Sequence, residues 1–310
     1  MGHKRTAKKG SIVKQVQTIL DGKLAIGEKK KPELSIKTED GRRLSDLKIY
    51  SWSTYHAYMQ HSIDFAQWAK EKHGCNNLEE ARKFVDDYLV YRMSYTSAWT
   101  TKLDASALAK LYDCRTTEFI KTPSRERKNI KRSRGSLSAR RRRCEKKNED
   151  IVRFCRATGL RRHELQALVG TQLGAKDGRF YIRNVKGKGG LVRDVPVVGT
   201  KDDIDFVIAK CQEAGASKVF TKIDKNLNIH GYRSDYACRF YMSIARKIED
   251  IPYDKYIPSM NRYVQSGVYL CQKDLAGVKY DKAAMKLVSE ALGHHRISVI
   301  AQSYLRNITR

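Results

Sequence analysis

The feature that most constrains this chain of 310 residues is a basic segment near its middle, residues 121–147. It reads KTPSRERKNIKRSRGSLSARRRRCEKK, with thirteen Lys or Arg and few apolar side chains. A segment of this composition adds little to a hydrophobic core, and its Pro and Gly favour irregular backbone. We therefore predict an interdomain linker, with one folded domain on each side.

The charge balance predicts a polyanionic partner. The chain has 62 Lys or Arg against 34 Asp or Glu, which gives a formal net charge of +28. Such a field favours nucleic acid, and we expect double-stranded DNA rather than a membrane surface. The alternative is a solubilising surface charge. The basic segment 1–43 is predicted to be an N-terminal arm, either a disordered tail or a DNA contact, with a short helix from Ile12 to Leu20.

The cysteines and the absence of long apolar runs indicate in which cellular compartment the protein is expected. Seven cysteines occur without a Cys-x-x-Cys pair, so neither a disulfide framework nor a zinc site is expected. Cys155 and Cys211 fall on apolar helical stripes and are predicted to be core thiols. No apolar run approaches 18 residues, and the N-terminus has no secretory pattern. We predict a cytoplasmic protein associated with DNA in the nucleoid.

Residues 44–120 have a helical apolar pattern. Apolar and aromatic side chains recur every three or four residues from Trp52 to Ala69, from Leu78 to Leu89 and from Trp99 to Leu111. This period is typical of amphipathic helices that share one core. We predict a small helical bundle whose aromatic side chains lie inside it.

Residues 148–310 have a mixed pattern. Two apolar segments, 180–185 and 191–197, flank the turn 186–190 (KGKGG), which is typical of a β-hairpin. Helices are predicted at 148–158, around Glu164, from the Thr200–Asp203 capping box to 214, from His230 to Ile248, from Asp281 to Gly293, and in a last segment that carries Tyr304. The expected fold class is mainly α, with a small antiparallel sheet in an α+β C-terminal domain.

The last part of the chain has the most specific chemistry. Residues 291–306 read ALGHHRISVIAQSYLR and place two histidines before Tyr304. A phenol is a weak nucleophile at neutral pH, because its unperturbed pKa is about 10. It becomes reactive where cations and a proton acceptor converge on the group that it attacks. Candidate partners are Arg161, Lys188, His230, Arg233 and His294.

Four motifs contain these partners, and their order and spacing resemble the tyrosine recombinase (phage integrase) family over about residues 45–306. Residues 158–165 (TGLRRHEL) are similar to the family's first box, and 230–233 (HGYR) to its H-x-x-R box, with Tyr replacing the usual Leu. Residues 187–189 (GKG) resemble the hairpin that carries the family's lysine, although Lys186 is an alternative to Lys188. Residues 292–294 (LGH) resemble the last box.

The resemblance implies a tyrosine-type site-specific DNA recombinase, or integrase. Arg161 and Arg233 would hold the scissile phosphate, with Glu164 supporting Arg161 and His230 and His294 managing protons. Tyr304 would attack to form a 3′-phosphotyrosine, and Lys188 would protonate the leaving 5′ oxygen. No metal or other cofactor is expected, because the covalent intermediate stores the bond energy.

The resemblance also implies an assembly. Two recombination sites would be joined through a Holliday junction on a tetramer that integrates or excises a mobile genetic element, with possible accessory DNA-bending or directionality factors. The implied organisation is a two-domain DNA clamp: an arm (1–43), a helical core-binding domain (44–120), the linker (121–147) and a catalytic domain (148–310). Linker residues expected on DNA phosphates are Arg127, Lys128, Lys131, Arg132, Arg134, Arg140, Arg141, Arg142 and Arg143.

Two departures from the family pattern leave alternatives open. Tyr304 stands ten residues after His294 rather than the usual nine, so His295 is a second candidate for the active-site histidine. Six residues follow Tyr304, so the C-terminal docking segment of many relatives is expected to be replaced or absent. A type IB topoisomerase and a non-catalytic DNA-binding relative are the competing functions. The complete set of motif residues favours the recombinase.

Overall fold

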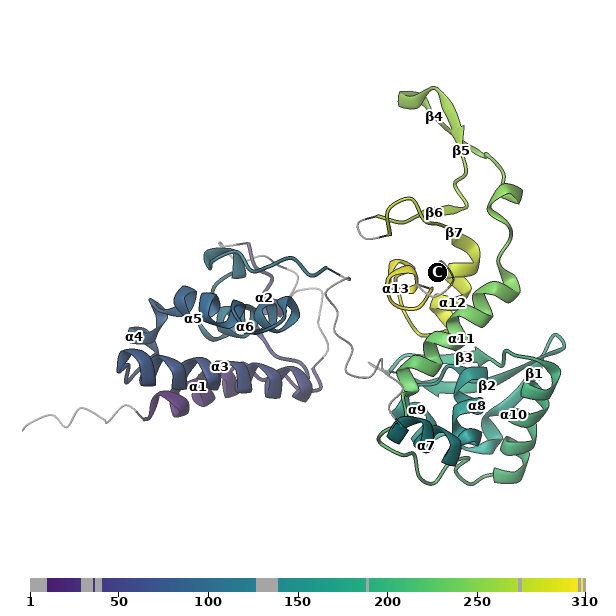
Figure 1. Ribbon diagram of the computed structural model, residues 1–310, viewed down its shortest axis with the longest axis horizontal. Coiled ribbons are helices and arrows are strands. Elements are labelled where there is room, and N and C mark those ends of the chain that lie inside the picture. Colours follow the sequence, from purple (N-terminus) through teal and green to yellow (C-terminus); the bar gives the residue numbers. More distant parts are fainter. Residues whose placement is uncertain are drawn as a thin grey trace, which may run out of the picture. The chain divides into compact units, whose positions relative to one another are not determined.

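The computed structural model describes residues 10–28, 36, 41–126, 139–187, 190–272, 275–305 and 308. The chain divides into two units between residues 129 and 130 (Figure 1). Helices dominate, and the strands form only small antiparallel sheets, as predicted. Within the described residues, no helix is both long and apolar enough to cross a membrane.

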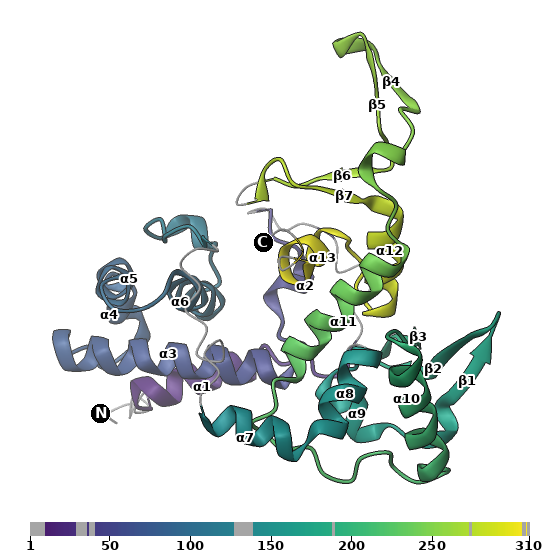
Figure 2. The same ribbon diagram turned by 45° about the vertical axis from the view of Figure 1, so that its right-hand side comes forward.

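Unit 1 is helical. Its helices are α1 (Ile12–Asp21), α2 (Leu44–Leu47), α3 (Trp52–His73), α4 (Leu78–Arg82), α5 (Val85–Met93) and α6 (Ala98–Leu111). Helix α1 lies along α3 in both views (Figure 1 and Figure 2). Its Ile12, Val16 and Leu20 are spaced four residues apart and are buried in the same core as α3, α5 and α6. Part of the segment 1–43, predicted as an arm, therefore belongs to this core.

The apolar segment that begins at Leu78 forms two helices rather than one. Asn77 caps α4 by accepting a hydrogen bond from the Glu80 backbone N–H at 2.9 Å. The backbone then leaves helical geometry at Phe84, with φ −98° and ψ 10°, and α5 begins at Val85. Burial of Tyr88 and Leu89 against α3 and α6 explains why the apolar period continues across the break.

The basic segment 121–147 ends in structure. Its last nine residues form α7 (Ala139–Lys147), and Cys144 is buried in the core of unit 2. The Tyr232 hydroxyl donates to the Glu145 carboxylate at 2.7 Å, which fastens α7 to unit 2. Arg142 and Arg143 are exposed on α7. The predicted contacts Arg127, Lys128, Lys131, Arg132 and Arg134 lie outside the described residues, as do the side chains of Arg140 and Arg141.

Unit 2 combines helices with three small antiparallel sheets. Its elements are α7, α8 (Glu149–Thr158), α9 (Arg162–Ala167), β1 (Leu173–Lys176), β2 (Arg179–Lys186), β3 (Val192–Pro196), α10 (Lys201–Ala214), α11 (Ile229–Ile244), β4 (Lys255–Ile257), β5 (Arg262–Val264), β6 (Val268–Leu270), β7 (Lys279–Asp281), α12 (Lys282–Ala291) and α13 (Ser298–Ser303). The sheets are β1-β2-β3, β4-β5 and β6-β7. The predicted capping box at Thr200 and Asp203, and the cap at Asp281, are confirmed.

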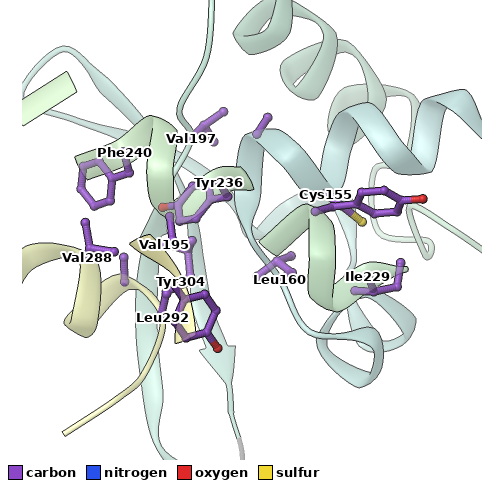
Figure 3. Close-up of a cluster of buried hydrophobic side chains, with 14 of the residues drawn as sticks. Cys155, Leu160, Val195, Val197, Ile229, Tyr236, Phe240, Val288, Leu292 and Tyr304 are labelled. Atoms are coloured by element: carbon purple, nitrogen blue, oxygen red, sulfur yellow. The ribbon is translucent and has the colours of Figure 1, made fainter. Parts of the chain in front are cut away.

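The core of unit 2 brings distant segments together. Figure 3 shows Tyr304 beside Leu292 and Val195, in a cluster that also holds side chains of α8 and α11. Cys155 and Cys211 are buried in this core, as predicted. At the end of α8, Gly159 has φ +59°, and a Cβ there would lie 2.3 Å from the Tyr236 ring. Only glycine fits, so this tight turn ends α8 and places Arg161, two residues later, at the start of α9.

Helix α11 is shorter than predicted and is followed by two β-hairpins that the sequence did not predict. It ends at Ile244 rather than Ile248, and Ala245 is extended. Arg246 is held away from the helix by Asp281, which accepts from its backbone N–H at 3.1 Å and from its Nε at 2.9 Å. The hairpins β4–β5 and β6–β7 then fill the chain between α11 and α12.

Candidate active site

Arg161 and Glu164 form one compact local unit at the start of α9. The Arg161 backbone N–H donates to Glu164 Oε2 at 2.7 Å, and its Nη1 donates to Oε1 at 2.8 Å. This arrangement places an acidic side chain where the first N–H groups of a helix need acceptors. Glu164 therefore contacts Arg161 directly, and its supporting role in a reaction stays a prediction.

Arg193 on β3 is a third member of this cluster that the sequence analysis missed. Its Nη1 and Nη2 donate to the two carboxylate oxygens of Glu164 at 3.0 and 2.9 Å, a bidentate pair. Its side chain is only 7% exposed. Burial alone would raise the pKa of Glu164, but hydrogen bonds from Arg193 and Arg161 lower it to about 2. The carboxylate is therefore ionised and held by two guanidinium groups.

Arg233 lies in the first turns of α11 and is almost completely buried, at 1% exposure. Its Nη1 donates to the Gly159 carbonyl at 2.5 Å, its Nη2 to the Leu292 carbonyl, and its Nε to the Tyr304 hydroxyl at 3.4 Å. Among the described residues, no carboxylate forms an ion pair with it. Burial lowers the pKa of Arg233, because its charge has left water.

The C-terminal end of α12 gathers all three arginines. The Leu292 carbonyl accepts from Arg233 and also from Arg161 Nη2 at 3.0 Å. The Ala291 carbonyl accepts from Arg193 Nε at 2.8 Å. The last carbonyls of a helix lack intrahelical partners and carry partial negative charge, so they attract cations. Gly293, at φ +64°, ends the helix and lets the chain turn away.

Tyr304 directly follows α13 and faces these groups. Its hydroxyl lies 3.1 Å from His294 Nε2, and its side chain is buried, with the residue 3% exposed. Its backbone carbonyl accepts from Ser234 Oγ at 3.1 Å and from Cys238 Sγ at 3.3 Å. α11 therefore positions Tyr304 through the backbone as well as through Arg233.

His294 is neutral at physiological pH. Burial and the nearby positive charges of Arg233, Arg161 and Arg193 lower its pKa to about 4. A neutral imidazole beside a phenol can accept the phenolic proton. His295 is exposed, so the geometry favours His294 over the alternative. The second predicted histidine, His230, is exposed at the start of α11, and its ring centroid lies 5.8 Å from that of Tyr304.

Lys188 and Gly189 lie outside the described residues, but the base of their hairpin is described. The Gly187 backbone N–H donates to the Leu191 carbonyl at 2.7 Å. A Cβ on Gly187 would lie 2.9 Å from Arg193 Nη1 and 3.4 Å from Glu164 Oε1. The chain enters the predicted lysine turn in contact with the arginine cluster. Lys186, the competing candidate, is exposed at the end of β2.

Arg162, the residue after Arg161, has a structural role. Its Nη1 donates to the Asp224 carbonyl at 2.9 Å, and its Nη2 donates to the Leu227 carbonyl at 2.9 Å. These bonds hold the segment just before α11, the helix that begins next to His230. The arrangement as a whole can bind an anion at Arg161 and Arg233 and can deprotonate a phenol next to it.

The chain resembles known proteins in structure but not in sequence. No family model matches the chain, and no curated protein matches its sequence. Among solved structures, the chain is similar to XerH site-specific recombinase bound to palindromic difH substrate in a post-cleavage complex, with 15% identity over 80% of this chain and 75% of that chain and a TM-score of 0.47. It is also similar to XerH bound to difH in a pre-cleavage complex (16% identity, 81% and 76% coverage, TM-score 0.44) and to XerA recombinase (12% identity, 83% and 88% coverage, TM-score 0.31).

Proposed function

We propose that this chain is a site-specific DNA recombinase that cleaves and rejoins strands through a 3′-phosphotyrosine. The observation that carries the proposal is Arg233, a buried cation without a carboxylate partner among the described residues, whose Nε points to the Tyr304 hydroxyl. A buried cation that is hydrogen-bonded only to neutral groups is costly, and an anion that joins it beside Tyr304 would lower that cost. A phosphodiester beside Tyr304 is such an anion.

The proposed reaction assigns a step to each group. Arg161 and Arg233 bind the non-bridging oxygens of the phosphate, and the Tyr304 oxygen attacks phosphorus while His294 takes its proton. The bond from phosphorus to the 5′ oxygen breaks, and Lys188 donates a proton to that oxygen. A 5′ hydroxyl from the partner strand then attacks the phosphotyrosine and releases Tyr304. Glu164 and Arg193 keep the guanidinium of Arg161 in place.

The closed site adds one requirement. Tyr304 and Arg233 are 3% and 1% exposed, so a phosphate reaches them only after the segment 294–305 shifts. The six-residue helix α13 lies within this segment, and its Ile300 and Ala301 are buried in the core of unit 2, so DNA contacts must offset the free energy of opening it. We infer that DNA binding exposes Tyr304 and thereby couples cleavage to assembly on the recombination site.

The remainder of the proposal concerns DNA and assembly. The net charge of +28 and the exposed Arg142 and Arg143 on α7 favour phosphate contacts, with the two units gripping one duplex as a clamp. Joining two sites through a Holliday junction requires four nucleophiles, and hence a tetramer. Integration or excision of a mobile genetic element, with accessory DNA-bending factors, is the biological setting that we propose.

A suicide-substrate assay tests the proposal without knowledge of the recombination site. Nicked duplexes randomised around the nick are incubated with the protein, and covalent adducts are separated on denaturing gels. We expect adducts from the wild type and from Tyr280→Phe, and none from Tyr304→Phe. Tyr280→Phe is a matched control because it removes a buried hydroxyl, 3.4 Å from the Leu305 carbonyl, from the same region.

Each outcome decides one part of the proposal. Adducts from Tyr304→Phe at the wild-type level would refute the nucleophile, and a wild type without adducts across the pool would refute cleavage. Sequences recovered from the adducts then define a site for the next assay. Resolution of a Holliday junction built from that site supports a recombinase, whereas relaxation of supercoiled DNA by the monomer alone supports a type IB topoisomerase.

A further inference from the structure

The hairpin β4–β5 stands away from the rest of unit 2 in both views (Figure 1 and Figure 2). Large side chains that normally lie inside proteins are exposed along it: Tyr253, Tyr256, Met260 and Tyr263. Contiguous exposed apolar and aromatic groups usually mark an interaction surface. The proposed reaction does not use this hairpin.

The strand register separates two kinds of side chain. Tyr256 pairs with Tyr263 across the strands, and their ring centroids are 5.2 Å apart. The neighbouring pairs, Lys255 with Val264 and Ile257 with Arg262, point to the opposite face. One face therefore presents two tyrosines, and the other presents two cations together with Ile257 and Val264. The sequence from residue 255 to 272 contains no Asp or Glu.

Hydrogen bonds hold the base of the hairpin, whereas its strands β4 and β5 form a sheet of only two strands. Asp254 accepts hydrogen bonds from the Ser266 backbone N–H at 2.8 Å and from its hydroxyl at 2.6 Å. Gln265 Nε2 donates to the Ile248 and Ile251 carbonyls at 2.8 and 2.6 Å. An isolated two-stranded ribbon is only marginally stable in water. A hairpin whose base is fixed and whose strands are uncovered is typical of an element that a binding partner stabilises.

We infer that β4–β5 is a DNA-binding ribbon that contacts duplex DNA away from the cleaved phosphate, an inference that rests on the proposed function. Lys255 and Arg262 outnumber Asp254, whose carboxylate accepts from Ser266, and this excess of positive charge favours a polyanion over a second copy of a chain that carries a net charge of +28. A two-stranded ribbon also fits the major groove of B-DNA. Lys255 and Arg262 then meet phosphates, and the tyrosines lie against sugars and base edges.

The length of α11 separates the hairpin from the active site. His230 and Arg233 lie at the N-terminal end of this helix, and the hairpin follows its C-terminal end. Sixteen helical residues span about 24 Å, and about 7 base pairs of a duplex have that length. The hairpin is therefore expected to contact flanking DNA rather than the cleavage position.

Photocrosslinking identifies the occupant directly. A diazirine amino acid is placed at Met260, at the tip of the hairpin, in the Tyr304→Phe background, and at Leu287 on α12 as a control that is exposed to a similar degree. With a random-sequence 40-base-pair duplex, we expect protein–DNA adducts from position 260 and few from position 287. Adducts between two copies, adducts within one chain, or equal DNA adducts at both positions would overturn the inference.

Salt dependence measures the charge contribution. Lys255→Gln with Arg262→Gln removes two cations, and each phosphate contact contributes about 0.9 to the slope of log affinity against log salt. We expect the slope on the same duplex to flatten by about 2, whereas the equally charged variant Lys201→Gln with Lys218→Gln leaves it unchanged. An unchanged slope in the hairpin variant overturns the inference. Cleavage is not needed for either measurement, so adduct formation by Tyr304 stands or fails separately.

Discussion

Replacing Glu164 with Gln tests how strongly the arginine cluster holds unit 2 together. The substitution keeps the shape of the side chain but removes the charge that Arg161 and Arg193 share. The pKa of Glu164 falls from an ordinary 4.5 to about 2 in the folded protein. At about 1.4 kcal/mol for each pKa unit, the ionised carboxylate contributes about 3 kcal/mol to the free energy of unfolding. Removing one partner of a buried ion pair costs a similar amount, about 3–5 kcal/mol.

The distribution of tryptophan provides an internal control. The chain has three tryptophans, Trp52, Trp68 and Trp99, and all lie in unit 1. Urea unfolding followed by tryptophan fluorescence therefore reports unit 1, whereas far-ultraviolet circular dichroism reports both units. We expect Glu164→Gln to destabilise the transition that appears only in circular dichroism, by about 3 kcal/mol. The fluorescence transition should keep its midpoint.

The pH dependence gives this prediction a second test. A carboxylate with a lowered pKa stabilises the fold above its unfolded pKa, and this stabilisation is lost as the pH falls through 4.5 toward 2. The difference between the wild type and Glu164→Gln should thus be constant from pH 7 to about 5.5 and shrink below about 4.5. A loss under about 1 kcal/mol at pH 7, or equal shifts in both optical transitions, would refute the role of the cluster.

Two further predictions concern the tyrosine and its proton acceptor. Ser234→Ala removes a hydrogen bond to the Tyr304 carbonyl worth about 1 kcal/mol, so hydrogen exchange in α13 should accelerate about fivefold. Ser243→Ala, whose hydroxyl bonds to Phe240 in the same helix, is the control, and equal exchange in the two variants would contradict the prediction. Because the pKa of His294 is about 4, single-turnover cleavage should stay level as the pH falls from 7 to 5.5; a decline centred near 6.5 would show that the acceptor is not this imidazole.

The sequence predicted those parts of the site whose partners are close along the chain. Arg161 and Glu164 are three residues apart, and their pairing requires only the first turn of one helix. The caps at Thr200 and Asp281 are equally local. Periodicity also located most of the helices, because apolar residues three and four apart leave a strong pattern.

Long-range parts of the site could not be read in this way. Arg193 meets Glu164 only through the register of β2 with β3, which shifts between Ile182 and Val185, where Asn184 has φ +54°. The strand β3 reads VRDVP, and its two adjacent charges, Arg193 and Asp194, do not indicate which of them is buried or with which partner. The hairpins β4–β5 and β6–β7 have strands of three residues, too short for an alternating pattern to be detected.

The charges of the site favour the transition state of the proposed reaction. Arg161, Arg193 and Arg233 carry three positive charges, Glu164 carries one negative charge, and His294 is neutral, which leaves +2 among these described groups. A phosphodiester carries one negative charge, and attack by a deprotonated phenol adds a second. Because His294 takes the phenolic proton, the net charge of these groups rises from +2 to +3 as the charge of the phosphate changes from −1 to −2, so their attraction is stronger in the pentavalent transition state than in the bound substrate. Under the proposed function, a site arranged in this way binds the transition state more tightly than the DNA itself, and that difference is what accelerates a reaction.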